Sequence, residues 1–588
     1  MAIKRMKLMC DFETTTDPED LRVWASCAVD IDTLETAFLG TDIDSFMEFL
    51  SGKNTVCYFH NLKFDGEFII YWLLKNGFEY SEKPFNKTFS TLITDTGIWY
   101  SISVIFEKKN KTYKKVVFYD SLKKLPFPVA TIAKAFNLPM SKGEIDYKAY
   151  RAPGHELTPE EKDYIIKDCR IVAEALQIQF AKGLKKMTNA SDAMGWYKNI
   201  IDKKNFERWF PTFPLEIDSD IRRAYKGGFT YLNPRFKDAR GQRGLTLDVN
   251  SLYPSVMYDC MLPYGYPTFF EGAPEYDENF PLFIVRLDCA FDLKPGHIPT
   301  IQLKNNYRFQ PTEYLTTTEG EVHSLFLTSV DLELFLEHYD VSSATYVSGW
   351  KFKGAKGLFR EYIDYWMHIK ETTTGAMRQL AKLMLNSLYG KFATNPRARK
   401  KMPGMVADEV LFSVGEVEER EPIYTAMGAF ITAYAREKTI RSAQAVFDRF
   451  IYADTDSLHL VGYEMPEGLE VHPTHLGAWK HEGYFSDSKY IRAKTYMETM
   501  GAPLGASLRV YASWTNKRAE MSLRELCVAL WGYQRELKTI VTCAGMPDNV
   551  KKQVTYENFR SGSSFGGKLM PRRYPGGVVL TETTFTIK

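Results

Sequence analysis

Cysteine is scarce in this chain, and its spacing excludes two common uses of the residue. Only eight cysteines occur in 588 residues, and no two of them form a Cys-x-x-Cys pair. Without such pairs the sequence shows no sign of a zinc site or of a disulfide framework, and scattered cysteines favour a reducing compartment. We therefore expect a protein that stays in the cytoplasm of the cell that makes it.

Long apolar runs are also missing. The longest, at 68–74, is far shorter than the roughly 18 residues that cross a bilayer, so we expect no membrane span. The basic residues at the N-terminus lead directly into a strand with carboxylates, which argues against a signal peptide.

A net charge of one sign is missing as well. The 75 Lys and Arg residues against 73 Asp and Glu residues leave only +2, so any contact with nucleic acid must come from local clusters. Aromatic residues are frequent at 14%, which suits base stacking and large cores equally. The length predicts two to four lobes at about 150 residues each.

The order of predicted elements indicates a mixed α/β fold with several domains. A first segment, to about residue 188, alternates short strands with helices and ends in a helix that Thr158, Pro159 and Glu161 begin as a capping box. In the second segment we predict the following elements: a strand at 245–249, short strands and turns over 262–357, a helix at 375–392, a basic loop at 397–401, a helix at 431–447 and a hairpin at 450–460.

A first group of acids lies in the N-terminal segment. Asp11 and Glu13 are two residues apart on a predicted strand, so they share one face. Asp65 follows, and Tyr164 and Asp168 are four residues apart on the capped helix, so they also share a face. Four converging acids would repel one another without metal, whereas two divalent ions would neutralise them and generate hydroxide for phosphodiester cleavage. Tyr164 could hold the attacking water.

Each of these residues also has a simpler explanation. An Asp-x-Glu pair on a strand is usually a solvated face, Asn61 and Asp65 can be turn residues, and Asp168 can be a surface acid of its helix. Their conjunction, in this order and on these elements, favours a nuclease site.

A second group of acids lies in the C-terminal segment. Asp248 ends an apolar strand, and Asp454 and Asp456 lie at the tip of the predicted hairpin, where they could meet Asp248 from a neighbouring strand. Ligands with oxygen only suit Mg²⁺ or Mn²⁺ rather than zinc. An acidic turn between strands is common outside metal sites too.

The helix predicted at 375–392 strengthens the case for a nucleotide site. Arg378, Lys382, Asn386 and Tyr389 are spaced 4, 4 and 3 residues apart and lie along one face, opposite an apolar face. Cations, an amide and an aromatic ring are what a nucleoside triphosphate requires for its phosphates and base. The alternative is a solvated helix face.

Together these segments resemble family B DNA polymerases, and most closely the protein-primed polymerases of small tailed bacteriophages of Gram-positive hosts. The likeness runs nearly from end to end, from the first strand to 575–580. Six motifs in the family's order carry it: Asp11-Phe12-Glu13-Thr14, Asn61-Leu62-Lys63-Phe64-Asp65, Tyr164-x-x-x-Asp168, Asp248-x-x-Ser251-Leu252-Tyr253-Pro254, Lys382-Leu383-Met384-Leu385-Asn386-Ser387-Leu388-Tyr389-Gly390 and Tyr452-x-Asp454-Thr455-Asp456.

The resemblance implies an RNase H-like 3′→5′ exonuclease domain at 1–188 and a right-hand polymerase domain at 189–588. The polymerase domain would comprise a palm at 189–260 and 428–540, a first insertion at 261–357, fingers at 358–393, a second insertion at 394–427 and a thumb at 541–588. The first insertion would contact a terminal protein. The second would close around the template and support processivity and strand displacement; its basic tip at 397–401 fits phosphate contact, although a solvated loop would look the same.

The resemblance also implies an activity and its partners. We expect protein-primed, DNA-dependent DNA synthesis with 3′→5′ proofreading, which replicates a linear phage-type genome in the cytoplasm of an infected bacterium. The partners would be primer-template DNA, single-stranded DNA, deoxynucleoside triphosphates and a terminal protein, and the polymerase would be a monomer.

For the polymerase site, the resemblance implies two Mg²⁺ ions, replaceable by Mn²⁺, held by Asp248, Asp456 and the carbonyl of Val249, with Asp454 close by. The nucleotide would be bound by Tyr253, which would exclude a ribose 2′-hydroxyl, and by Lys370, Arg378, Lys382, Asn386 and Tyr389. The primer-template would be bound by Tyr225, Gly227, Gly228, Lys494 and Tyr496.

For the exonuclease site, the resemblance implies two further Mg²⁺ ions and a set of catalytic and binding residues. The metal ligands would be Asp11, Glu13, Asp65, Glu144 and Asp168, assisted by Tyr164 and Lys142. The single-stranded 3′ end would be held by Asn61, Phe64, Ser121 and Leu122, and the terminal protein would be contacted by His60 and Phe68.

Some positions depart from the family pattern. Arg378 and Glu144 stand where we expect Lys and Asp, and the fork of an arginine is not a point charge. The stretch 499–539 is longer than the family pattern, and its Trp514 and Trp531 fit either a DNA-binding surface or simple packing. Two rival functions stay open: a polymerase that extends only ordinary primers, and a DNA-binding scaffold without catalysis that descends from a polymerase. The second group of acids excludes a plain nuclease.

Overall fold

The computed structural model describes residues 5–109, 112–147, 149–302, 314–501 and 538–588. Most of the divergent stretch 499–539, including Trp514 and Trp531, lies outside the described residues. None of the helices in the described ranges has the length and apolar content that crossing a bilayer requires. The seven cysteines within these ranges are free thiols.

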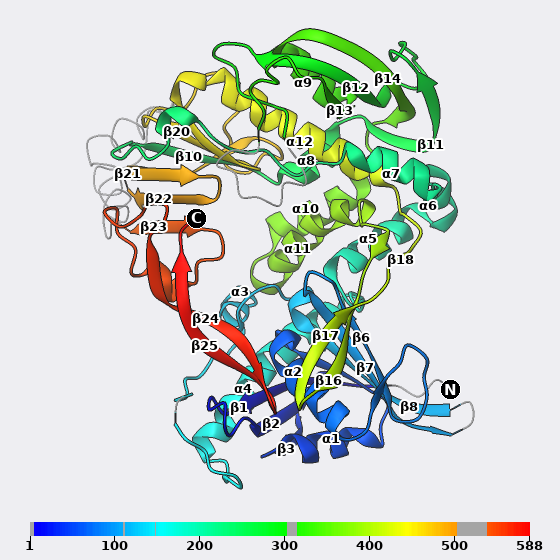
Figure 1. Ribbon diagram of the computed structural model, residues 1–588, viewed down its shortest axis with the longest axis vertical. Coiled ribbons are helices and arrows are strands. Elements are labelled where there is room, and N and C mark those ends of the chain that lie inside the picture. The colour runs from blue at the N-terminus through cyan, green and yellow to red at the C-terminus, as the bar shows by residue number, and fades with distance from the viewer. Residues whose placement is uncertain (1–4, 110–111, 148, 303–313, 502–537) are drawn as a thin grey trace.

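An eight-stranded mixed sheet forms the N-terminal lobe, drawn in blue in Figure 1. Its strands follow the order β3-β2-β1-β4-β8-β7-β6-β5, and the central β1, β4 and β8 are parallel. The strands are β1 (Met6–Thr14), β2 (Val23–Asp30), β3 (Thr36–Gly40), β4 (Thr55–Phe59), β5 (Glu79–Tyr80), β6 (Thr88–Ile93), β7 (Trp99–Lys109) and β8 (Thr112–Asp120).

Helices cover both faces of this sheet because the strand side chains alternate. Leu8, Cys10 and Phe12 of β1 join the core with α1 (Ile43–Ser51) and α2 (Leu62–Lys75), whereas Met9 faces the core of α4 (Pro159–Ala181). The predicted capping box of α4 is present, because Thr158 Oγ1 accepts from the Glu161 amide while Glu161 accepts from the Thr158 amide.

A seven-stranded antiparallel sheet forms the predicted palm. Its order is β23-β22-β21-β10-β20-β19-β9. The strands are β9 (Thr230–Leu232), β10 (Gly244–Val249), β19 (Phe450–Asp454), β20 (Ser457–Val461), β21 (Trp479–Arg492), β22 (Thr495–Met500) and β23 (Thr539–Cys543). Strand β23 crosses the predicted 540/541 boundary, so the palm sheet extends slightly into the predicted thumb. The helix α12 (Thr425–Ala445), which packs beneath this sheet, likewise begins before residue 428.

The predicted first insertion is a separate four-stranded sheet with the order β11-β14-β12-β13. Its elements are β11 (Leu262–Glu271), β12 (Leu282–Leu293), β13 (His323–Thr328), α9 (Ser329–His338) and β14 (Tyr339–Ala355). The expectation of short strands was wrong, since β14 runs for 17 residues. Gly349 lies within this strand where the neighbouring backbone approaches closely, because a Cβ there would come within 2.2 Å of the Ile284 carbonyl oxygen on β12.

The helices of the predicted fingers are α10 (Arg360–Thr372) and α11 (Gly375–Phe392). They lie between the eight-stranded sheet of the N-terminal lobe and the seven-stranded palm sheet. They pack with α5 (Asn189–Ile201), which follows directly from the N-terminal lobe. The sequence predicted the bounds of α11 correctly.

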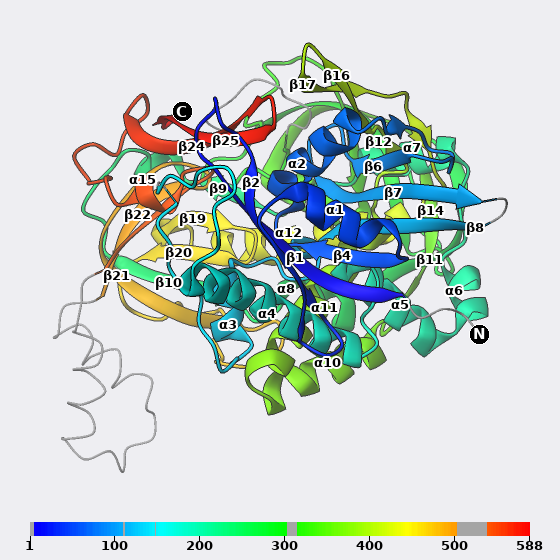
Figure 2. The same cartoon turned by 90° about the horizontal axis from the view of Figure 1, so that it is seen from below.

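Two long hairpins reach from the polymerase side to the N-terminal lobe, as Figures 1 and 2 show. They are β24 (Ser564–Tyr574) with β25 (Gly577–Thr586), and β16 (Lys401–Val406) with β17 (Glu409–Val414). Arg573 of β24 donates two hydrogen bonds, of 2.9 and 2.6 Å, to Glu67 of α2. The same guanidinium lies 4.6 Å from the ring centroid of Phe412 on β17. Three parts of the chain therefore meet at one arginine, which we call the clasp (Glu67, Arg573 and Phe412).

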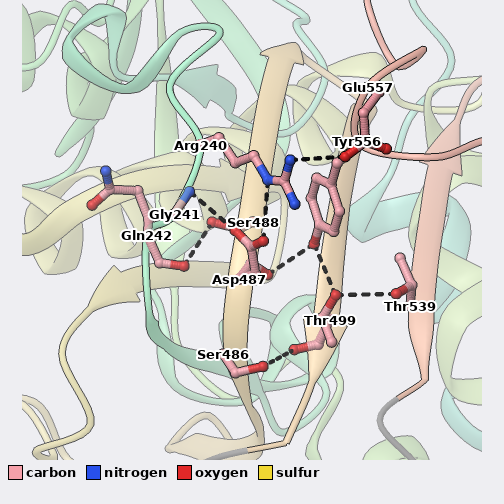
Figure 3. A network of polar contacts seen from close by, with 10 residues as sticks. All are labelled: Arg240, Gly241, Gln242, Ser486, Asp487, Ser488, Thr499, Thr539, Tyr556 and Glu557. Carbon is pink, nitrogen blue, oxygen red and sulfur yellow. Dashed lines mark hydrogen bonds and ion pairs between the residues drawn. The ribbon is translucent and has the colours of Figure 1, made fainter.

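A polar network joins the palm sheet to the C-terminal segment (Figure 3). Arg240 donates to Asp487 at 3.2 Å and to Glu557 at 3.1 Å, and its guanidinium lies over the ring of Tyr556. The Tyr556 hydroxyl donates to the carbonyl oxygen of Asp487 at 3.0 Å and contacts Thr499. This network holds the base of the β24–β25 segment against the palm.

Candidate active sites

The alternation of β1 decides where the first acids lie. Asp11 and Glu13 share the parity of Met9, so they face α4, while Phe12 packs against Phe46 and Phe59 on the other side. From α4, Tyr164 and Asp168 are buried towards the same place, with 3% and 5% of their surfaces exposed. The predicted shared faces are therefore present on both elements.

Asp65 reaches this group from the first turn of α2, where it is buried. The helix starts at Asn61, whose backbone has a left-handed φ of 74°. Asp120 stabilises this start, because its Oδ1 accepts from the amides of Asn61, at 3.2 Å, and Leu122, at 3.1 Å. Sequence reasoning missed Asp120, although an Asp before Ser121-Leu122 at the end of a strand is a signal for a capped turn.

Burial raises the pKa values of all four acids, and repulsion from neighbouring acids raises those of Asp11, Glu13 and Asp65 further. Burial and the charge of Asp168 raise the pKa of Asp11 to about 7, and burial with the charges of Asp11 and Asp168 raises the pKa of Glu13 to about 9. The pKa of Asp65 rises for the same reasons, burial and then the charge of Asp11. Lys142, whose Nζ lies 3.0 Å from Asp168, offsets part of the repulsion.

One buried oxygen at this site lacks a partner, whereas the Tyr164 hydroxyl has one. The Oδ1 of Asp168 is buried without a hydrogen-bond partner, and a buried carboxylate oxygen without a partner is costly. Tyr164 OH lies 2.6 Å from the hydroxyl of Tyr147, on the segment that also carries Lys142. Burial and this hydrogen bond raise the pKa of Tyr164, which keeps its hydroxyl protonated.

Several residues predicted for this lobe lie differently from what their assigned roles suggest. The Ser121 side chain is fully buried and bonds to His60 Nδ1, at 2.9 Å, and to the Phe59 carbonyl. Ser121 therefore supports the site from behind, while Asn61 is exposed and Phe64 is half-buried.

The predicted partner contacts are also engaged internally. His60 uses its second ring nitrogen on the Phe127 carbonyl at 2.8 Å. Phe68 is 2% exposed and packs where a Cβ on Gly577 of the thumb hairpin would come within 2.5 Å of its ring. Phe68 is thus a contact between lobes, and a partner protein could reach it only if that hairpin moved. Glu144, in contrast to the buried Glu13, Asp65 and Asp168, is exposed.

The second group of acids meets as predicted at the edge between β10 and the β19–β20 hairpin. Asp248 of β10 lies opposite Ser457 of β20, and the Val249 amide donates to the Asp456 carbonyl oxygen at 2.7 Å. Burial and the charge of Asp456 raise the pKa of Asp248 to about 7, and burial also raises the pKa of Asp456. The two carboxylates are therefore close enough to repel each other.

Asp454 contacts a different set of residues from Asp456. Its Oδ1 accepts from Lys494 Nζ at 2.8 Å and from Thr230 at 3.2 Å, and its Oδ2 accepts from Tyr452 at 3.3 Å. The Tyr452 hydroxyl also accepts from the Lys494 amide at 2.8 Å. Asp454 therefore links the hairpin to the Lys494-Thr495-Tyr496 segment rather than pairing with Asp248.

Beneath this segment lies a buried polar cluster that the sequence did not indicate. Glu498 Oε1 lies 2.6 Å from His459 Nδ1 and accepts from the hydroxyl of Tyr490. All three are buried, and Tyr496 stacks on Tyr490 with ring centroids 5.4 Å apart. The cluster supports the strands that carry Asp454 and Lys494.

Contacts with α10 and with the turn after β10 link the predicted nucleotide-binding face of α11 to the strand that carries Asp248. Lys370 Nζ donates to Ser251 Oγ at 2.7 Å, and Arg378 donates to the Lys370 carbonyl. Tyr253 and Tyr389 stack with ring centroids 4.0 Å apart. Lys382 and Asn386 are exposed on the same helix. Burial and the charges of Arg378 and Lys382 lower the pKa of Lys370, so the three cations lie close enough to repel one another.

The segment 225–228, whose Tyr225, Gly227 and Gly228 are predicted to bind the primer-template and which we call the template loop, touches the acidic hairpin directly. A Cβ on Gly228 would come within 2.7 Å of the Thr455 side chain, so only glycine fits there. Arg436 donates to the carbonyls of Lys226 and Gly227, at 3.1 and 2.9 Å, which fixes the loop, and Tyr225 before it is half-buried.

Within each site the acids are neighbours, but as described they do not form a complete set of metal ligands. Among the residues that the structure describes, no three His, Cys, Asp or Glu side chains are close enough to hold a metal ion as they stand.

The family of the chain follows from its sequence match. A family model described as DNA polymerase type B, organellar and viral, matches residues 47–153 and 149–472. The chain belongs to this family. It is therefore a type B DNA polymerase, as its motifs predicted.

Similar proteins cover the polymerase from end to end. The DNA polymerase of Bacillus phage PZA is 48% identical over 590 residues, which covers 99% of this chain and 100% of the relative. The DNA polymerase of Streptococcus phage Cp-1 is 33% identical over 609 residues, with 98% of each chain covered. The structure of phi29 DNA polymerase complexed with primer-template DNA and incoming nucleotide substrates superposes with a TM-score of 0.91, at 47% identity and with both chains fully covered. The predicted resemblance and the predicted multidomain α/β fold are confirmed.

Proposed function

We propose that this type B polymerase starts DNA synthesis on a protein hydroxyl, extends DNA in the polymerase site and proofreads in the N-terminal lobe. The observation that carries the proposal is the meeting of Asp248 with Asp456 through the 2.7 Å bond between Val249 and Asp456. The relative whose structure contains primer-template DNA and incoming nucleotides supports the same two substrates here.

Both groups of acids fit divalent cations. Asp248, Asp456 and the carbonyl of Val249 would hold Mg²⁺ in the polymerase site, and Asp11, Glu13, Asp65 and Asp168 would hold it in the exonuclease site. The raised pKa values and the unpartnered Asp168 Oδ1 support this, because a cation would relieve both. When bound, Mg²⁺ would lower the pKa of the attacking hydroxyl or water and stabilise the leaving oxygen. Mn²⁺, which prefers the same oxygen ligands, should replace it.

In the polymerase site the protein's own side chains orient the substrates. Lys370, Lys382 and Arg378 would compensate the charge of the triphosphate before the transition state forms. The Tyr253–Tyr389 stack would form the floor for the sugar and base and exclude a 2′-hydroxyl. Lys494, held by Asp454, would hold the primer end beside Asp248.

In the exonuclease site the protein holds a frayed 3′ end and a water. Asn61 and Phe64 are accessible to a single strand. Tyr164 OH would orient the attacking water, and Lys142 would hold Asp168 in place.

The proposal is tested by separating the two activities. Replacing Asp456 by Asn should abolish nucleotide addition in a primer-extension assay and spare the degradation of single strands, whereas replacing Asp11 and Glu13 together by Ala should do the reverse. Loss of both activities in either variant, with unchanged thermal unfolding, would contradict the two-site arrangement.

Protein priming needs its own test, since a polymerase that extends only ordinary primers would share both sites. Purified polymerase should transfer a labelled deoxynucleotide to a serine, threonine or tyrosine of a terminal protein encoded by the same genome. Extension of DNA primers on a circular single-stranded template without any transfer to that protein would favour the alternative. A scaffold without catalysis would do neither.

A further inference from the structure

A long irregular segment lies against the acids of the N-terminal lobe. It follows α3 (Val129–Ala135), spans residues 139–158 and leads into α4. Its described residues, 139–147 and 149–158, form neither a helix nor a strand. Segments of such length without secondary structure are uncommon in compact domains and usually serve a function. We call this stretch, drawn in cyan in Figure 1, the cover segment.

The first half of the cover segment contacts the proposed exonuclease site. Lys142 Nζ lies 3.0 Å from Asp168 Oδ2 and 5.8 Å from the centroid of the Tyr164 ring. A Cβ on Gly143 would come within 3.1 Å of the same ring. The hydroxyl of Tyr147 lies 2.6 Å from that of Tyr164. The cover segment therefore forms part of the surroundings of two groups that the proposed mechanism uses.

These contacts are too exposed to hold the segment in place by themselves. The Lys142 side chain is 34% exposed, and Tyr147 is 53% exposed. Polar contacts that water can screen contribute little to stability. The segment therefore requires a buried anchor elsewhere along its length.

Arg151 is such an anchor, with only 5% of its surface exposed. Its Nη1 donates to the carbonyl oxygens of Asp146, at 2.6 Å, and Ala149, at 2.9 Å, so this side chain closes the segment back on itself. Its Nε donates to Glu161 Oε1 at 3.0 Å, and its guanidinium lies 4.3 Å from the ring centroid of Trp24. The planar fork of an arginine, with its several donors, suits this set of partners, whereas the point charge of a lysine does not.

The partners of Arg151 belong to the framework that carries the acids. Glu161 belongs to the capping box of α4 and lies seven residues before Asp168 on that helix. Trp24 lies on β2, which pairs with β1. The charge of Arg151 also reaches the acids, because burial raises the pKa of Glu13 and this charge opposes the rise. Arg151 thus joins the cover segment to both elements of the site.

We propose that Arg151 is a positioning residue of the exonuclease site. Its guanidinium holds the cover segment so that Lys142 stays beside Asp168 and Tyr147 stays beside Tyr164. Without this anchor the segment moves away, Asp168 loses its cation, and cleavage slows. The inference rests on the proposed proofreading function and adds to it a residue that acts through other side chains.

Degradation of a 5′-labelled single strand by the full chain in Mg²⁺ tests this proposal. In Arg151→Gln the maximal rate should fall by about 10- to 100-fold, the usual loss when a group that orients a metal ligand is removed. The KM for the strand should change less than about 3-fold, because the lost interaction acts on the chemical step rather than on DNA binding. The same preparation should extend a matched primer at the original rate, which shows that the chain is folded.

Two other variants separate positioning from charge and from general stability. Arg170→Gln is the matched control, because Arg170 is an exposed arginine of α4 whose Nε donates to the Leu34 carbonyl at 3.1 Å. This control should degrade single strands at the original rate. Arg151→Lys keeps the buried charge without the fork and should still lose about 10-fold, also where Arg151→Gln does not fold. Full activity of Arg151→Lys would overturn the proposal, since charge alone would then suffice.

Combination with Lys142→Ala tests whether Arg151 acts through Lys142. Once the Lys142 side chain is absent, its position no longer matters. The double variant Arg151→Gln/Lys142→Ala should therefore be slower than Lys142→Ala by less than about 3-fold. Losses that multiply in the double variant would mean that the two residues act independently, which contradicts the proposed role.

A measurement without metal or DNA follows the cover segment itself. Lysyl endopeptidase should cut after Lys142 at least about 10-fold faster in Arg151→Gln, because cleavage tracks the population in which the segment is open. Arg170→Gln should be cut at the original rate, and unchanged cleavage in Arg151→Gln would refute the anchor. If the original chain degrades no single strands, the proposed exonuclease function fails as well. If the original chain and Arg151→Gln degrade them equally fast, only the positioning role of Arg151 is refuted.

Discussion

The clasp offers a way to test whether the two long hairpins keep the polymerase closed around DNA. Glu67 is only 3% exposed, and its carboxylate accepts two charge-assisted hydrogen bonds, of 2.9 and 2.6 Å, from Arg573. Replacing Arg573 by Ala removes both bonds and leaves a buried charge without a partner. It also removes the contact with the ring of Phe412. We expect the variant to open between the thumb hairpin and α2.

The structure sets the size of this effect. Breaking a fully buried ion pair costs about 3–5 kcal/mol, because the remaining charge is uncompensated. The Arg573 side chain is 42% exposed, so water already screens part of the interaction and we expect about 2 kcal/mol. A change of 2 kcal/mol corresponds to about a 30-fold shift of the equilibrium towards the open form. If DNA leaves through the open form, the mean product length per binding event should fall by up to this factor.

Primer extension under single-binding conditions measures this length directly. The polymerase is bound to a labelled primer on a long circular template, and synthesis starts together with an excess of heparin as a trap. Arg573→Ala should give short products, while its rate of adding a single nucleotide stays within 2-fold of the original.

The partner residue provides the control. In Arg573→Ala/Glu67→Gln the buried group is neutral, so the cost of burying it falls and part of the product length should return. Full-length products from Arg573→Ala would refute the reasoning. A double variant whose products are no longer than those of the single variant would also refute it, because that result would show that Glu67 and Arg573 act independently.

Three other outcomes follow from the polymerase side. The pKa of Asp248 is about 7 in the folded protein, above its ordinary 3.8, so its contribution to stability is full below pH 3.8 and is lost as the pH rises to about 7. Thermal unfolding in the presence of a chelator should show this loss, and Mg²⁺ should reverse it at pH 8. Asp248→Asn should remove the part of the pH dependence that Asp248 causes. Tyr253→Val should admit ribonucleotides about 100-fold better relative to deoxynucleotides, since the ring that would meet a 2′-hydroxyl is gone; single-nucleotide incorporation measures the ratio, and an unchanged ratio would exclude Tyr253 as the gate. Glu498→Ala should lower the free energy of unfolding in urea by about 2–4 kcal/mol, because His459 and Tyr490 lose their buried acceptor. Glu498→Gln should lower it less, and equal losses of stability in the two variants would show that hydrogen bonding at this position does not matter.

Periodicity was sufficient to predict which acids share a face of one element. The alternation of β1 placed Asp11 and Glu13 on the face opposite Phe12, and the four-residue spacing placed Tyr164 and Asp168 on one face of α4. Both patterns depend only on the geometry of a single element, which the sequence specifies directly. The hairpin of Asp454 and Asp456 was predictable for the same reason.

Contacts between distant segments were not predictable in this way. The pairing of Glu67 with Arg573 joins residues more than 500 positions apart, and nothing in the local pattern around either of them requires the other. The burial of Phe68 against Gly577 has the same origin. It gives a residue for which the resemblance implies contact with a terminal protein a contact within the chain.

The backbone conformations of the motifs explain why their residues depend on one another. Asn61, Ser251, Thr455 and Lys494 all have φ between 55° and 74°, a region that residues with a Cβ rarely adopt. The first three lie in predicted motifs, and Lys494 is predicted to bind the primer-template. Thr455 is the least suited to it, since it is β-branched, and such strain persists only where the surroundings impose it. The surroundings do so here: the Thr455 amide donates to the Phe229 carbonyl at 2.6 Å, and its own carbonyl accepts from Thr439 at 2.7 Å. The missing side chain of Gly228 leaves room for the Thr455 side chain. The loop before β9 and the helix α12 thus hold the hairpin tip in the conformation that brings Asp456 to Asp248, so the template loop and the catalytic acids form one structural unit.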